Sequence, residues 1–122
     1  MTLLELELAL HTVSESNARG HWGKRAKRAK EQRGVVCLAL RARQPSNWVF
    51  PAVAPLVVTI ARVAPRALDD DNLRGALKGV RDGVADWLEI NDRDPRVSWA
   101  YAQERGGVRQ YAVKIRVERM GS

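Results

Sequence analysis

Cysteine is scarce in this chain, because Cys37 is the only one among 122 residues. A single thiol excludes an internal disulfide framework and a zinc site built from several cysteines. His11 and His21 have no spacing typical of a zinc or Cys-His site. The chain also lacks any run of about 18 apolar residues, and it begins with alternating leucine and glutamate. We therefore expect no membrane span, no secretory signal and a cytoplasmic location.

Acidic residues are in the minority, with 14 Asp and Glu against 21 Lys and Arg, which gives a net charge of +7. The surplus is concentrated between Ser14 and Arg43, where basic residues far outnumber Glu15 and Glu31. The balance reverses between Pro65 and Pro95, where acids outnumber bases. A strongly basic segment favours a polyanionic partner such as nucleic acid, and the acidic segment calls for a separate explanation.

The hydrophobic pattern predicts the order β-α-β-α-β-β in a single small domain over residues 1–122. This order is typical of an α/β (α+β) fold with a mixed sheet of about four strands and two helices. The expected elements are a strand over 4–10, a helix from about 18 toward 40, a strand over 56–63, a helix over 72–89 and a final β-hairpin that turns at 104–107.

The second predicted helix has one apolar face and a separate stripe of glycines. At 100° per residue, six apolar side chains fall on one arc and form the expected core face. Gly75, Gly79 and Gly83 recur every four residues, and each costs about 1 kcal/mol relative to alanine inside a helix. We expect them to permit close approach of another backbone, either the sheet or a dimer mate. The core residues are Leu73, Leu77, Val80, Val84, Trp87 and Leu88.

An acidic run, Asp69-Asp70-Asp71-Asn72, lies between the second strand and the second helix. Helix capping explains one aspartate at this place. Three adjacent carboxylates repel one another unless a cation or strong hydrogen bonds compensate, and their hard oxygen atoms suit Mg²⁺ or Mn²⁺. The residues alone leave capping and metal binding open.

Two further groups of polar residues follow the acidic run. Lys78 and Asp82 form an i,i+4 pair on the side of the helix opposite the apolar arc. Such a pair is either an exposed ion pair or a source of positive charge for a phosphate. Asn91-Asp92-Arg93-Asp94 has the composition of a polar turn.

Leu68 to Asn72, Lys78, Asp82, Leu88 and Asn91-Asp92 together resemble the signature of the RusA-type Holliday junction resolvases, which are homodimeric Mg²⁺-dependent endonucleases of bacteria and their phages. The resemblance is most specific between residues 65 and 103. It implies that the chain is one RusA-like endonuclease domain that resolves four-way junctions in DNA recombination and repair by paired phosphodiester hydrolysis. The implied metal-binding and catalytic carboxylates are Asp69, Asp71 and Asp92, with Asp70 as an alternative to Asp69, and Lys78 is the implied catalytic lysine.

The basic segment supplies the expected DNA-binding surface, because lysine and arginine side chains neutralise phosphates. Trp48 and Phe50 lie in a proline-rich loop and either pack over the sheet edge or act as an apolar wedge at a branch point. Two alternative functions remain open: a non-catalytic basic module whose acids only cap a helix, and a metal-dependent nuclease without junction preference. The DNA-binding residues are Arg19, Lys24, Arg25, Lys27, Arg28, Lys30 and Arg33.

Overall fold

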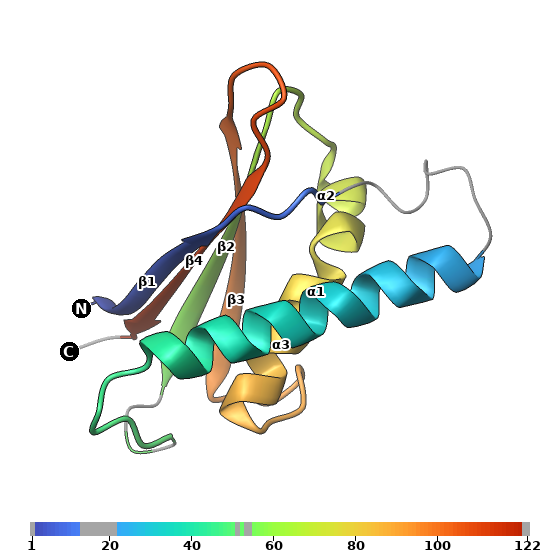
Figure 1. The fold of residues 1–122 in the computed structure, drawn as a ribbon. Coiled ribbons are helices and arrows are strands. Elements are labelled where there is room, and N and C mark those ends of the chain that lie inside the picture. The colour runs from blue at the N-terminus through green and yellow to red at the C-terminus, as the bar shows by residue number, and fades with distance from the viewer. Residues whose placement is uncertain (1, 13–21, 51, 53–54, 121–122) are drawn as a thin grey trace.

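The computed structural model describes residues 2–12, 22–50, 52 and 55–120, and these form a small α+β domain with a mixed four-stranded sheet (Figure 1). The fold class therefore agrees with the sequence-based expectation. No helix among these residues is long and apolar enough to cross a membrane. In chain order the elements are β1 (Thr2–Leu8), α1 (Trp22–Arg43), β2 (Leu56–Ala64), α2 (Asp70–Ala76), α3 (Lys78–Leu88), β3 (Val97–Arg105) and β4 (Ala112–Arg119).

The predicted terminal hairpin is wrong, because β3 and β4 do not pair with each other. The strand order is β1-β4-β2-β3, so β4 lies between β1 and β2 and is antiparallel to both. β3 pairs in parallel with β2 at the edge of the sheet. The cause is the apolar content of β4: Val113, Ile115 and Val117 are fully buried, which favours a central strand with two neighbours. β3 has exposed polar residues at its end, and such residues suit an edge.

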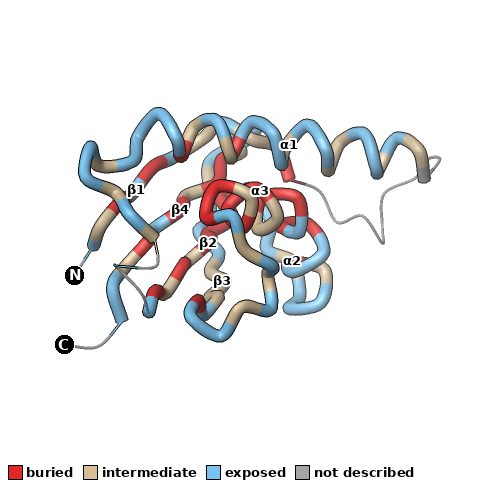
Figure 2. The backbone as a smooth tube through the Cα atoms, turned by 90° about the horizontal axis from the view of Figure 1, so that it is seen from below, coloured by how far each residue is buried: buried red, intermediate tan, exposed pale blue. Residues whose placement is uncertain are grey.

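All three helices pack on the same face of the sheet (Figures 1 and 2). The predicted core face of the second helical segment is confirmed, because all six of its apolar residues are buried. Helix α1 crosses this layer, and its N-terminal part extends beyond the sheet and α3 (Figures 1 and 2). The first turns of α1 thus lie outside the layer of helices that covers the sheet.

The second predicted helix is divided at Leu77 into α2 and α3. Leu77 has φ −98° and ψ 3°, outside the α-helical region, and its side chain is fully buried. Gly75 and Gly79 flank it, and glycine has weak helix propensity. Gly34, by contrast, does not interrupt α1.

Two glycines of the predicted stripe contact α1, which corrects the expectation of the sheet or a dimer mate. A Cβ atom on Gly79 would lie 3.0 Å from the carbonyl oxygen of Ala29. A Cβ atom on Gly83 would lie 2.7 Å from the carbonyl oxygen of Arg33 and 2.8 Å from Cβ of Val36. At Gly75 nothing lies within 4 Å. The glycines therefore set the close spacing of α1 and α3.

Replacing Glu89 with glycine is expected to stabilise the fold. Glu89 ends α3 in the left-handed conformation, with φ 58° and ψ 43°, a position where glycine carries no steric cost. The side chain is exposed, so little packing is lost. We expect a gain of about 0.5–1 kcal/mol, seen as a higher midpoint of thermal unfolding. An unchanged or lower midpoint would show that Glu89 makes a compensating interaction, and Glu89→Ala, which keeps the strain, provides the control.

Candidate active site

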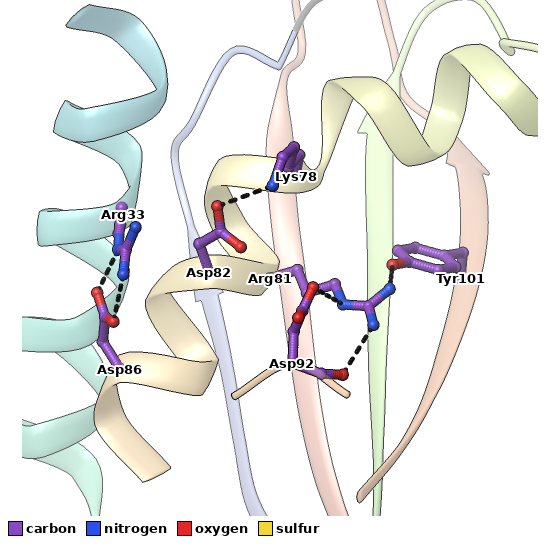
Figure 3. A network of polar contacts seen from close by, with 7 residues as sticks. All are labelled: Arg33, Lys78, Arg81, Asp82, Asp86, Asp92 and Tyr101. Carbon is purple, nitrogen blue, oxygen red and sulfur yellow. Dashed lines mark hydrogen bonds and ion pairs between the residues drawn. The ribbon is translucent and has the colours of Figure 1, made fainter. Parts of the chain in front are cut away.

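A polar pocket of about 370 Å³ lies where α1, α3 and the segment after α3 meet. It brings together Lys78, Asp92 and Arg33, which the sequence had selected as site residues, with Asp82 and Asp86. Figure 3 shows how these side chains face one another. Ala85, Ile90 and Asn91 complete the lining.

Lys78, Asp82 and Asp86 follow the polar side of α3 at intervals of four residues, so each lies one turn beyond the last. The Lys78 ammonium is 3.3 Å from Oδ2 of Asp82, which confirms that the predicted pair is in contact. The Lys78 side chain remains 70% exposed. An exposed pair of this kind contributes only a few tenths of a kcal/mol. The lysine side chain is therefore accessible from solvent at the pocket.

Arg33 and Asp86 link α1 to α3 through two hydrogen bonds. Nε and Nη2 of Arg33 donate to the two carboxylate oxygens of Asp86 at 2.5 and 2.7 Å. These bonds lower the pKa of Asp86 and raise that of Arg33. Arg33, selected from sequence as a DNA-binding residue, is thus engaged with a carboxylate of the same chain.

Arg81 lies beside this pocket and connects α3 with β3 and with Asp92. Nη1 donates to the Tyr101 hydroxyl at 2.8 Å, and Nη2 donates to the Asp92 carbonyl at 3.0 Å (Figure 3). The guanidinium carbon lies 4.7 Å from the centre of the Trp99 ring. Trp99 also donates its indole N–H to the Asp92 carbonyl at 3.1 Å. Sequence reasoning did not assign Arg81, Trp99 or Tyr101 to the site, although the aromatic alternation of β3 was visible.

The acidic run lies at the start of α2. Asp69 is the N-cap, and its Oδ1 accepts the backbone N–H of Asn72 at 2.9 Å. Asp70 and Asp71 occupy the first turn, where the helix dipole favours negative charge. Asp70 also lines a small pocket of about 190 Å³ with Arg74, Trp99 and Tyr101. Trp99 therefore lies between the start of α2 and the Asp92 segment.

The expected metal ligands do not form a three-residue cage. Among the described ranges, no three His, Cys, Asp or Glu side chains are grouped so that they could hold a metal ion. Mg²⁺, however, is usually bound through one or two carboxylates together with water and substrate phosphates. Asp69 accepts the capping hydrogen bond at Oδ1, and Asp92 accepts the Arg81 hydrogen bond at its backbone carbonyl, so both side chains keep carboxylate oxygens for other partners. Oxygen donors of this kind are the type that Mg²⁺ and Mn²⁺ prefer.

The basic residues of α1 differ in exposure. Lys24, Lys27 and Lys30 are exposed and recur every three residues, whereas Arg25 and Arg28 are partly buried. Arg19 lies outside the described residues. The three lysines lie in the N-terminal half of α1. Their ammonium groups give this side of α1 a positively charged surface.

The aromatic loop after α1 packs against α3. The Trp48 and Trp87 rings stack with centroids 4.7 Å apart and an angle of 19° between their planes. The Trp87 indole N–H donates to the Gln44 side chain at 2.8 Å. Trp48 and Phe50 pack against the core as partly buried residues. The loop therefore packs on α3 through Trp48, and not over the sheet edge as one of the two interpretations expected.

Comparison with known proteins found one similar bacterial sequence. An uncharacterized protein of Xylella fastidiosa (strain Temecula1) is 40% identical over 79 residues, which cover 63% of this chain and 52% of that protein. The chain therefore spans about half the length of the curated relative that it matches. No family model matches the chain.

Proposed function

We propose that the protein is a metal-dependent endonuclease that cleaves branched DNA, with the four-way junction as the favoured substrate. The observation that carries this proposal is the convergence of Lys78, Asp82 and Asp92 on one polar pocket. Trp99 connects this pocket with the acidic start of α2, because it contacts Asp92 and lines the pocket that contains Asp70. The junction preference and the reaction class rest on the resemblance to the RusA-type resolvases.

Each group of residues has a distinct part in this proposal. Lys24, Lys27 and Lys30 bind the DNA backbone through the exposed side of α1. Asp69 or Asp70, with Asp71 and Asp92, supply oxygen ligands for Mg²⁺ or Mn²⁺. When bound, the metal supplies the means to activate water and neutralise charge on the phosphate. Lys78 is exposed at the pocket and stabilises negative charge on the phosphate.

A homodimer fits the same proposal, because resolution of a junction requires two incisions. A two-fold symmetric pair of chains places two equal sites on opposing strands. The active form would then be a homodimer, and the protein would be a bacterial or phage enzyme that acts in DNA recombination and repair in the cytoplasm.

One observation favours a second candidate, a non-catalytic basic module that binds nucleic acid. Asp69 caps α2 directly, as that candidate requires. Capping nevertheless uses a single carboxylate oxygen and does not account for Asp70, Asp71 and Asp92. The nuclease accounts for more of the acidic residues and is therefore our principal proposal.

The proposal is tested by incubating the protein with a labelled four-way junction, a duplex and a single strand, each with Mg²⁺ or with chelator. We expect Mg²⁺-dependent, paired cleavage of the junction and little cleavage of the other two. Equal cleavage of all three would support a nuclease without junction preference. Binding without cleavage under every metal condition would favour the basic module.

Asp71→Asn is expected to abolish cleavage while the affinity for DNA, measured with chelator present, stays close to that of the unchanged protein. The substitution removes a negative oxygen ligand but leaves α1 intact. Glu118→Gln, at the far end of the sheet, is the matched charge control. Full cleavage by Asp71→Asn would remove Asp71 from the proposed site.

A further inference from the structure

The three carboxylates of the polar pocket differ in how their oxygen atoms are used. Asp86 is held by two short hydrogen bonds from Arg33, and Asp82 accepts one longer contact from Lys78. Asp92 is different, because the hydrogen bonds to it from Arg81 and Trp99 reach its backbone carbonyl. Its carboxylate lies 3.7 Å from Nε of Arg81, which is an ion-pair distance beyond hydrogen-bond range.

Arg81 therefore forms its hydrogen bond with the Asp92 backbone and forms none with the Asp92 carboxylate. The carboxylate is 38% exposed and faces the pocket with Asp82 and Lys78. Nε of Arg81 is buried and has no hydrogen-bond partner. The contact between Arg81 and the Asp92 carboxylate is therefore an ion pair without the two parallel hydrogen bonds of a bidentate pair. A bidentate pair like Arg33–Asp86 would instead occupy both oxygens.

The guanidinium is itself fixed from two other directions. The Tyr101 hydroxyl accepts from Nη1, and the Trp99 ring lies under the guanidinium plane. Trp99 and Tyr101 both come from β3, which is paired along its length with β2. Two residues of β3 thus fix the position of the Arg81 guanidinium, and Arg81 in turn fixes the backbone of the segment after α3 at Asp92.

We propose that Arg81 is a positioning residue, which presents the Asp92 carboxylate to the pocket by anchoring the Asp92 backbone. This inference rests on the proposed function for its effect on cleavage. Lysine does not replace arginine here, because one ammonium group lacks the planar fork that reaches the Tyr101 hydroxyl and the Asp92 carbonyl together. Arg74 is a natural control, since it is an arginine of α2 whose guanidinium also lies over the Tyr101 ring, at 5.8 Å.

The direct test is amide hydrogen exchange of the metal-free protein. In Arg81→Met, and also in Arg81→Lys, we expect exchange of residues 90–94 to increase at least about tenfold while β2 and β4 stay protected. Arg74→Met should leave residues 90–94 unchanged. Unchanged exchange in a folded Arg81→Lys variant would overturn the proposal.

Cleavage kinetics test the consequence for the site. Arg81→Lys should lower kcat at least about tenfold, with little change in the affinity for junction DNA measured in chelator. Tyr101→Phe should cause a smaller loss, and it should add nothing in the Arg81→Lys background because both act through the same network. Faster exchange with unchanged kcat would make Arg81 purely structural and overturn its positioning role.

The exchange experiment remains decisive if the proposed function fails. An unchanged protein that cleaves no DNA would contradict the nuclease proposal. Exchange of residues 90–94 would still show whether Arg81 anchors this segment, because it is measured without metal or DNA. The two failures are therefore distinguishable.

Discussion

Replacing Gly83 with alanine is expected to destabilise the fold by about 2–3 kcal/mol, although alanine favours helix by about 1 kcal/mol. The added Cβ would lie 2.7 Å from the backbone oxygen of Arg33, and backbone in the middle of α1 cannot move aside as a flexible side chain does. Separation of α1 from α3 would also loosen Val36, which is fully buried between them. Thermal unfolding should show a midpoint lower by roughly 10 °C.

Gly34→Ala is the matched control for this prediction. Gly34 lies in the middle of α1, and nothing stands within 4 Å of the position of its missing Cβ. The same change should therefore stabilise the protein by up to about 1 kcal/mol. Opposite signs at the two positions would establish that Gly83 is required for helix packing. Equal stabilisation by both alanines would mean that α1 and α3 are not in close contact at Gly83.

The sequence predicted the helices and strands better than it predicted which strands pair with one another in the sheet. Alternation located the strands, and the helical period identified the buried face from Leu73 to Leu88, because both patterns report local geometry. Strand order depends on competition among strands for the centre of the sheet. A short turn sequence at 104–107 indicated a hairpin, but burial of Ile115 and its neighbours placed β4 between β1 and β2.

In the candidate site, too, local patterns identified individual residues but not their contacts with other elements. Lys78 and Asp92 were selected from sequence, and they line one pocket, whereas Asp69 and Asp71 lie at the start of α2. Arg81 was not selected, because its role depends on Trp99 and Tyr101, which parallel pairing of β3 with β2 brings beside α3. Arg33 was assigned to DNA from the charge of its segment, whereas its contact with Asp86 depends on how α1 crosses α3. Local sequence patterns therefore predicted which residue types lie in the site, but they did not predict contacts between elements that are distant in the sequence.

Asp69→Asn is expected to leave stability unchanged within a few tenths of a kcal/mol and to reduce Mg²⁺-dependent cleavage at least about 100-fold. Asparagine is as good an N-cap as aspartate, so its side-chain oxygen still accepts the Asn72 N–H. The substitution removes the negative charge, which a divalent cation requires more than a helix end does. Thermal unfolding and single-turnover cleavage of a four-way junction measure the two effects on one variant.

Asp69→Ala and Asp70→Asn complete the comparison. Asp69→Ala loses the cap as well, so it should cost about 1 kcal/mol of stability in addition to activity. Asp70→Asn separates the two possible ligands, because loss of cleavage in this variant with full activity in Asp69→Asn would assign the ligand to Asp70. Full activity in both asparagine variants would restrict Asp69 and Asp70 to capping and the helix dipole, and Asp71 would be the one proposed ligand left in the acidic run.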